Sequence, residues 1–191
     1  MSRWIGSRGQ LIVYAIDPAT VVVRDVEGVT FRAATAGDAP RYARDVGTDS
    51  ITTFVRRLDA TNRCFIVDMD DRIVHSSWFT TSKSWVGEIA AYFILPPRHG
   101  YVYESFTHPR ARGRGLYPLA LARICRLVAD EGCPRVWVAI EEDNLSSRRA
   151  VEKAGFEAIY AIAFERRLGS VRHRVAAERE ELAPRISSHP A

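Results

Sequence analysis

The chain has 191 residues and a mass of 21.5 kDa, which fits one domain with short extensions. Hydrophobic residues make up 47% and charged residues 26%, a composition that excludes a largely disordered chain. The net charge of +4 is too small to indicate nucleic-acid binding by itself, and no run approaches the ~18 apolar residues that cross a bilayer. We expect a cytoplasmic protein, because the first residues lack the apolar run of a signal peptide.

The first part of the chain is predicted to form short strands followed by two helices. Strands are expected at residues 10–16, 21–26 and 29–34. Thr35 and Asp38 form a capping-box-like start for a helix that runs to about residue 46. Apolar residues spaced at i, i+3, i+4 and i+7 predict a second helix over residues 51–58, with Ser50 as its cap.

The rest of the chain alternates between strands and helices. Strands are expected at residues 64–67, 73–80, 85–95, 101–107 and 135–140, with a hairpin of residues 156–167 and 171–174. Helices are expected at residues 116–131 and 144–154. This order predicts a mixed α/β (α+β) fold around one central sheet.

The elements suggest three divisions of the chain. Residues 1–28 are expected to be an N-terminal extension with short strands, which could lengthen the sheet or form the edge of a homodimer. Residues 29–175 would form the domain itself. Residues 176–191 are read as a polar tail, either a helical turn or a loose segment.

The spacing of cysteine and histidine gives no sign of a metal. The three cysteines include no C-x-x-C pair and the five histidines no H-x-x-x-H pair, so neither a disulfide framework nor a metal site is predicted. Lysine occurs only at Lys83 and Lys153, so nearly all of the positive charge is arginine, whose planar guanidinium can hold two phosphate oxygens at once.

A loop rich in glycine and arginine joins the strand at 101–107 to the helix at 116–131. Gly113 and Gly115 allow a tight turn and a close approach of the backbone to a ligand. Free N–H groups at the start of the helix, together with its dipole, favour an anion such as phosphate. Positive charge is added by Arg110, Arg112 and Arg114. The loop reads G-x-G-x-x-P and is not followed by G-K-[ST], so it is neither a dinucleotide fingerprint nor a Walker P-loop.

This loop resembles the acyl-CoA-binding signature R/Q-x-x-G-x-G/A of the GCN5-related N-acetyltransferases, the GNAT superfamily. Arg112 takes the R/Q place and Gly115 that of the central glycine, while Tyr117 stands where the family has a small residue. An alignment on Arg110, Gly113 and Gly115 fits every letter. We prefer the first alignment, because His-Pro before R-G-x-G is common in the family.

A second block agrees with the first. Asn144-Leu-Ser-Ser147, followed by Lys153-Ala-Gly-Phe156, resembles the family's N-x-x-[AS]…K-x-G-F block. The resemblance extends from residue 29 to about residue 174. It implies a GNAT-like central mixed sheet flanked by helices, with extra N-terminal strands.

The resemblance implies a site for acetyl-CoA, or another acyl-CoA, as co-substrate in a split between the strands at 101–107 and 135–140. The residues expected around it are Phe106, Thr107, Arg112, Gly113, Arg114, Gly115, Leu116, Tyr117, Asn144 and Ser147. The family's reaction is direct attack of an amine on the thioester carbonyl. We therefore expect a small-molecule or peptide amine as acceptor, with no nucleic acid, membrane or metal as partner.

The resemblance also suggests candidates for the general base and the general acid. The amine must lose a proton, and Glu104 stands where many family members carry a catalytic glutamate, with Glu88 as the alternative base. The tyrosine that often protonates the departing thiolate is replaced by Val151. Tyr117 could act as the acid, as could Tyr160 or water.

The acceptor pocket and two other functions remain open. In the family the first two helices and the loop around residues 78–85 shape this pocket; here they offer an aromatic wall and two cations, Trp78, Phe79, Trp85, Arg56 and Arg57. The chain could instead be a non-catalytic sensor or interaction module that binds acyl-CoA. An RNA-binding module that uses the arginine–glycine loop is a further alternative, but several acidic residues lie close to that loop in the sequence.

Overall fold

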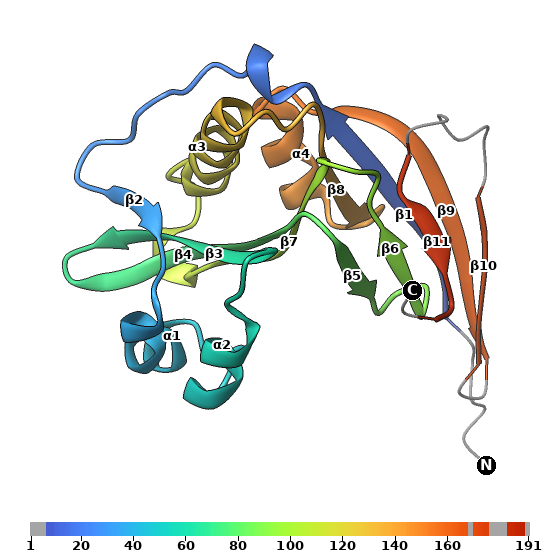
Figure 1. Cartoon of the computed structure of the whole chain (residues 1–191), viewed down its shortest axis with the longest axis horizontal. Coiled ribbons are helices and arrows are strands. Elements are labelled where there is room, and N and C mark those ends of the chain that lie inside the picture. The colour runs from blue at the N-terminus through green and yellow to red at the C-terminus, as the bar shows by residue number, and fades with distance from the viewer. Residues whose placement is uncertain (1–6, 168–169, 176–182, 190–191) are drawn as a thin grey trace.

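The structure, a computed structural model, describes residues 7–167, 170–175 and 183–189. Its main feature is an eight-stranded sheet in the order β10-β9-β1-β8-β7-β4-β3-β2, beside a three-stranded sheet in the order β11-β6-β5 (Figure 1). The strands of the large sheet are β1 (Ser7–Ile16), β2 (Thr30–Ala33), β3 (Asn62–Met69), β4 (Arg72–Thr80), β7 (Gly100–Thr107), β8 (Val136–Glu141), β9 (Glu157–Arg167) and β10 (Ser170–Val175). Those of the small sheet are β5 (Lys83–Val86), β6 (Ala91–Ile94) and β11 (Arg185–Ser187).

Helices flank the large sheet on both faces. Figure 1 shows α3 and α4 on one side of it, and α1 and α2 on the other side, beneath β3 and β4. The α-helices are α1 (Ala39–Asp45), α2 (Ile51–Arg57), α3 (Leu116–Asp130) and α4 (Leu145–Lys153). The predicted mixed α/β fold with a central sheet between helices is confirmed.

Helix α3 is held against the large sheet by the apolar stripe that predicted it. Leu121, Ile124 and Val128 of α3 are buried in one cluster with Val138 and Ile140 of β8. Burying an aliphatic side chain of this size stabilises a fold by roughly 1.5–3 kcal/mol relative to leaving it exposed. This packing therefore fixes the start of α3 in relation to the end of the neighbouring strands.

The opposite face of the sheet is anchored by aromatic residues. Trp78 of β4 is fully buried together with Tyr42 of α1 and Phe54 of α2. The Trp78 indole Nε1–H donates a hydrogen bond to the Tyr42 hydroxyl at 3.1 Å, and the Phe54 ring lies 5.4 Å from the Trp78 ring. The two short helices are thereby attached to β4, next to the bulged part of β7.

The N-terminal strand lies inside the large sheet. β1 pairs antiparallel with β8 on one side and with β9 on the other, whereas the edge strands are β2 and β10. Residues 7–16 are thus an interior strand of the sheet, which differs from the expectation of an extension that lengthens the sheet or forms a dimer edge. Residues 1–6 of that predicted extension lie outside the described residues.

Two strand predictions are wrong. Residues 21–26 are β-branched but pair with no strand of the described chain, since this segment crosses α3 instead of a sheet edge (Figure 1). The strand expected at residues 85–95 is split into β5 and β6 by a turn over residues 87–90, where Ala90 has a φ of 48°. In the predicted tail, residues 176–182 and 190–191 lie outside the described residues, and β11 pairs with β6.

The parallel strands β7 and β8 separate toward their carboxyl ends. They pair only at Gly100 with Val136, Tyr101 with Trp137 and Val102 with Val138. Beyond these three positions β7 runs on to Thr107 and β8 to Glu141 without pairing with each other. On its other side β7 stays paired with β4, so only its edge toward β8 is available to a ligand that enters between the strands.

A bulge lies in β7 at the point where the strands diverge. Tyr103 pairs with Trp78 and Phe106 with Ser76, so that Glu104 and Ser105 lie opposite the single residue Ser77 of β4. Glu104 adopts a φ of 45°, which a residue with a side chain rarely does outside such irregularities. The bulge changes the direction in which the next side chains point.

Candidate active site

A cavity of about 710 Å³ lies at the carboxyl end of β7. Its wall is formed by the end of β7, by residues 111–118 and by the first turns of α4. It brings together residues that are far apart in the sequence, including nine of the ten expected around the co-substrate: Phe106, Thr107, Arg112, Gly113, Gly115, Leu116, Tyr117, Asn144 and Ser147. The tenth, Arg114, lines a neighbouring cavity.

The glycine-rich loop presents backbone N–H groups to this cavity. Gly113 and Gly115 have φ values of 78° and 77°, in the left-handed region that favours glycine, and a Cβ at either position would meet nothing within 4 Å. Gly115 is the N-cap of α3 and offers no side chain to the first turn of the helix. Within the described part of the chain, the N–H groups of residues 113–117 have no hydrogen-bond acceptor. Together with the helix dipole they form a site suited to an anion.

The arginines of the loop are arranged unequally. Arg112 folds back along the strand, where its Nε donates to the Thr107 carbonyl oxygen at 3.3 Å. Arg110 and Arg114 are exposed to solvent. The loop therefore carries exposed positive charges at its rim.

Asn144 and Ser147 lie at the start of α4, across the cavity from the loop. The Asn144 side-chain oxygen accepts a hydrogen bond from the Ser147 N–H at 3.2 Å, which is an N-cap. This leaves the amide nitrogen of the exposed Asn144 side chain for other partners. The capping role proposed by the sequence pattern and a role in the cavity are thus compatible.

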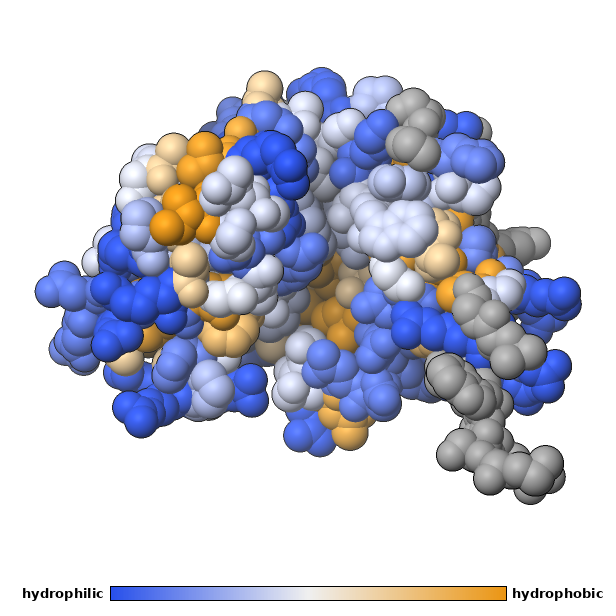
Figure 2. Space-filling model, turned by 90° about the horizontal axis from the view of Figure 1, so that it is seen from below, coloured by the Kyte–Doolittle hydropathy of each residue, from blue (hydrophilic) through white to orange (hydrophobic). Residues whose placement is uncertain are grey.

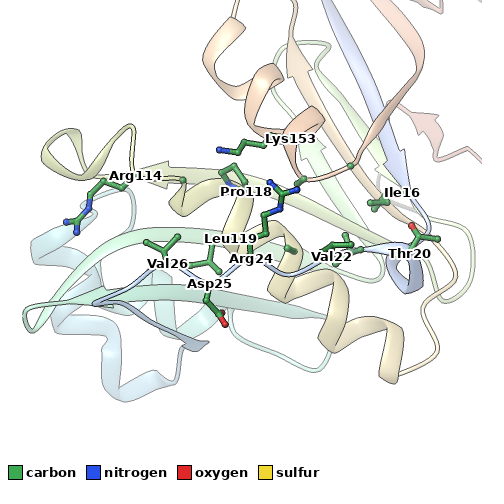
Figure 3. Close-up of a pocket in the computed structure, with 15 residues that line it drawn as sticks. Ile16, Thr20, Val22, Arg24, Asp25, Val26, Arg114, Pro118, Leu119 and Lys153 are labelled. Atoms are coloured by element: carbon green, nitrogen blue, oxygen red, sulfur yellow. The ribbon is translucent and has the colours of Figure 1, made fainter.

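A second cavity, of about 410 Å³, adjoins the first. It shares Gly115, Pro118 and Lys153 with the larger cavity and is closed on its other side by residues 20–26. In Figure 3, Arg24 and Lys153 lie beside Pro118, and Arg114 lies further along the loop. The irregular segment at residues 20–26 thus adds basic charge next to the N-terminus of α3.

Glu104, the predicted base, is held in an ion pair. Its carboxylate lies 2.7 Å from the Arg57 guanidinium, which also contacts Asp49 at 2.6 Å. The same guanidinium stacks on Trp78, 4.0 Å from the ring centroid. The Glu104 side chain is 54% exposed and does not line the large cavity, so the structure places it beside the cavity on the face that carries α2.

Tyr117, the predicted acid, faces a polar group that sequence reasoning missed. Burial raises the pKa of Tyr117 to about 12, while a hydrogen bond with the Ser105 side chain lowers it. The Tyr117 ring also lies 5.5 Å from the ring of His75 on β4. His75, Ser76 and Ser77 are three consecutive polar residues on a predicted strand, and such a run by itself gives no signal of a site.

His75 is fully buried and hydrogen-bonded at both ring nitrogens. Its Nδ1 lies 2.8 Å from the Thr107 hydroxyl and its Nε2 lies 2.9 Å from the Ser77 hydroxyl. The Ser77 hydroxyl in turn lies 2.8 Å from that of Ser105. Burial lowers the pKa of His75 to about 3, so the imidazole is neutral at physiological pH.

The other catalytic alternatives lie away from the cavity. Glu88, expected on a strand, is in the turn between β5 and β6. Tyr160 is buried in the core cluster between β1, β9 and the small sheet, and Val151 is fully buried in the core. None of these three residues lines the large cavity.

Most of the side chains expected to line the acceptor pocket are buried or engaged in ion pairs. Trp78 and Phe79 are fully buried and cannot contact a ligand, whereas Trp85 on β5 is 52% exposed. Arg57 is committed to its ion pairs, and Arg56 is exposed. Figure 2 shows a hollow with hydrophobic surface at its base between the side of the molecule that carries α1 and α2 and the side that carries β5 and β6.

Among the described residues, no group of three or more His, Cys, Asp or Glu side chains is arranged to hold a metal ion. None of the described helices has the length and apolar character required to cross a membrane.

Known proteins share this architecture. An acetyltransferase from Photorhabdus laumondii is 27% identical over 93 residues, which are 48% of this chain and 65% of that protein. A GCN5-related N-acetyltransferase from Sphaerobacter thermophilus aligns with a TM-score of 0.62 at 14% identity, over 87% of this chain and 51% of that one. One from Kribbella flavida aligns with a TM-score of 0.56 at 19% identity, over 80% and 55%. The chain thus spans between half and two thirds of the length of these proteins.

A match to a family model covers the site. The model of the acetyltransferase (GNAT) family matches residues 38–156, more than half of the 191 residues. This region contains the separated strands β7 and β8, the glycine-rich loop and α4. The chain therefore belongs to the acetyltransferase (GNAT) family.

Proposed function

We propose that the protein transfers an acetyl group from acetyl-CoA to a primary amine, by direct attack of the amine on the thioester while both are bound. The observation that carries this proposal is the anion site of the loop at the mouth of two separated parallel strands. An elongated molecule with a diphosphate at one end and an acyl thioester at the other fits both features at once.

The cavity offers groups of the right chemistry for acetyl-CoA. The N–H groups of residues 113–117 would hold the diphosphate, since they are free and the adjoining glycines leave open space. Arg114 and Lys153 would add positive charge. The edge of β7 that faces β8, which has no strand partner from Tyr103 to Thr107, would hydrogen-bond to the amide-containing arm, as a strand addition.

The acceptor would approach from the face shown in Figure 2, through the hollow between the side that carries α1 and α2 and the side that carries β5 and β6. The flanking elements expose apolar side chains, Ile51 and Val55 on α2 and Trp85 on β5. We therefore favour an amine carried by a small molecule or a peptide with an apolar portion. The buried Trp78 and the ion-paired Arg57 would shape this side of the site through Glu104, without contacting the acceptor themselves.

The experiment is a pair of measurements on the purified chain. Acetyl-CoA at ~100 times its Kd would stabilise the fold by ~2.7 kcal/mol, which raises Tm by ~5–10 °C at this size. A free-thiol assay with a panel of primary amines, with mass spectrometry of the products, would then detect acetyl transfer. No change of Tm with acetyl-CoA, CoA or longer acyl-CoAs would contradict the proposal.

A non-catalytic acyl-CoA-binding module is the second candidate. Two observations favour it: Val151 occupies the position of the family's frequent tyrosine, and Glu104 is engaged by Arg57. This candidate predicts the same rise of Tm with acetyl-CoA but no release of free thiol above the rate of spontaneous hydrolysis with any amine.

A further inference from the structure

We infer that Ser105, Ser77, His75 and Thr107 form a hydrogen-bonded relay that carries the proton of the acceptor amine away from the reacting nitrogen. Ser105 would be the catalytic residue that meets the amine, and His75 and Ser77 would be positioning residues behind it. This inference rests on the proposed function and identifies the base that Glu104 does not readily provide.

The relay begins and ends at the same cavity. The hydroxyls of Ser105 and Thr107 belong to residues that line it, and the two inner members, Ser77 and His75, are fully buried or nearly so. The three consecutive hydrogen bonds measure 2.8, 2.9 and 2.8 Å. A buried chain of this kind, open at both ends to a cavity, has no evident purpose in packing alone, because apolar residues would fill the same space without needing partners.

The bulge in β7 makes the first contact possible. Because Glu104 and Ser105 both lie opposite Ser77, the Ser105 hydroxyl comes within hydrogen-bond distance of the Ser77 hydroxyl. Glu104 is held with a φ of 45° in the same bulge. Backbone strain of this type is typical of functional sites.

The partners of His75 leave its tautomer free. A hydroxyl can donate or accept, so neither Ser77 nor Thr107 determines which ring nitrogen carries the proton. His99 differs: its Nδ1 accepts from the Trp137 Nε1–H at 3.0 Å, which fixes the proton on Nε2. A neutral ring with two hydroxyl partners can take a proton at one nitrogen while it releases one from the other.

The proton balance closes without any change in the charge of the protein. The amine nitrogen gives a proton to Ser105 Oγ, and Ser105 passes its own proton to Ser77. Ser77 passes its proton to His75 Nε2, and His75 releases the Nδ1 proton to Thr107, which gives its own to water in the cavity. Each residue of the relay gains one proton and loses one. The N–H bond that breaks leaves its electron pair on the amine nitrogen, and this pair attacks the thioester carbonyl.

The surroundings of His75 keep the ring neutral throughout. Tyr117 of α3 is the titratable side chain that faces it, and burial is the influence that lowers its pKa. β4 and β7 contribute the uncharged hydroxyls of Ser77 and Thr107. Because a free imidazolium would not form, the ring can act only by exchanging protons between its two nitrogens.

The first test compares Ser77→Ala with Ser76→Ala. Ser76 is a buried neighbour on the same strand that takes no part in the relay, so its variant is a matched control for the loss of one buried hydroxyl. At pH 7 we expect Ser77→Ala to lower kcat about 100-fold, with KM for acetyl-CoA changed less than about threefold, and Ser76→Ala to stay close to the parent enzyme. The deficit of Ser77→Ala should shrink as the pH approaches the pKa of the amine, because a neutral amine needs no base.

A deficit of Ser77→Ala that equals that of Ser76→Ala, or that stays constant with pH, would overturn the relay while leaving acetyl transfer by the parent enzyme established. A second readout does not need turnover. Nitrogen-15 NMR of labelled histidine should show both tautomers of His75 in the parent protein and a single tautomer in Ser77→Ala. One fixed tautomer in both proteins would refute the relay even if no acceptor amine had been found.

Discussion

Replacing Gly115 by alanine tests whether the loop binds the co-substrate through its backbone. Gly115 has a φ of 77°, and a Cβ there meets nothing within 4 Å. The intrinsic penalty for an L-residue in the left-handed region is roughly 1–2 kcal/mol, part of which is offset because alanine restricts the unfolded chain. We expect the free energy of unfolding to fall by about 1 kcal/mol and Tm by about 2–4 °C.

Gly28 offers a matched control. Its φ is 73°, its Cβ would also meet nothing within 4 Å, and it lines neither of the two cavities at the loop. Gly28→Ala should therefore lose a similar amount of stability. The two variants should differ only in binding, because the methyl group at position 115 would project into space that a diphosphate needs.

The assay is isothermal titration of each variant with acetyl-CoA, beside thermal unfolding of the free proteins. We expect the Kd to rise at least about tenfold in Gly115→Ala, equivalent to about 1.4 kcal/mol, and to change less than about twofold in Gly28→Ala. Equal Kd values in the two variants, at equal losses of Tm, would refute the assignment of the loop as the diphosphate site.

Three further predictions concern stability and pH. The pKa of His75 is about 3 in the folded protein and about 6.5 in unfolded chains, so the unfolded state binds an extra proton between these pH values. The free energy of unfolding should therefore fall as the pH drops below about 6.5, by about 2 kcal/mol at pH 5. Burial also lowers the pKa of His99, which acts in the same direction. Urea unfolding at pH 5–7.5 of the parent protein and of His75→Gln would measure the share of His75. The same dependence of the unfolding free energy on pH in both proteins would contradict this prediction. Arg57→Met should cost roughly 3 kcal/mol by leaving the buried Asp49 unpaired, and adding Asp49→Asn should recover part of this in urea unfolding. Asn144→Ala should cost about 1 kcal/mol through loss of the helix cap, and an unchanged urea midpoint would contradict the capping role.

The sequence was sufficient to identify the loop and its family because the loop depends on local chemistry. Gly113 and Gly115 supply backbone conformations that other residues resist, and α3 follows at once from its apolar stripe. Such features are encoded within about 20 consecutive residues. The elements flanking the site, β7, β8 and α4, were likewise predicted from their own periodicity, capping and turn residues.

Only the tertiary structure decided which strands became neighbours. The β-branched run at residues 21–26 has the composition of a strand but finds no partner, while β1 enters the middle of the sheet between β8 and β9. Pairing depends on hydrogen bonds between segments far apart in the chain, and composition carries no information about which segment lies alongside.

The same reason applies to the catalytic groups. Glu104 was a reasonable candidate from its place on the strand, but its ion pair with Arg57 depends on how α2 packs beneath the sheet. The contact between His75 and Thr107 joins two strands, and that between Ser77 and Ser105 requires the bulge in β7. Local sequence determined the glycine-rich loop, whereas the arrangement of the polar groups of β4 and β7 near the cavity arose from long-range packing.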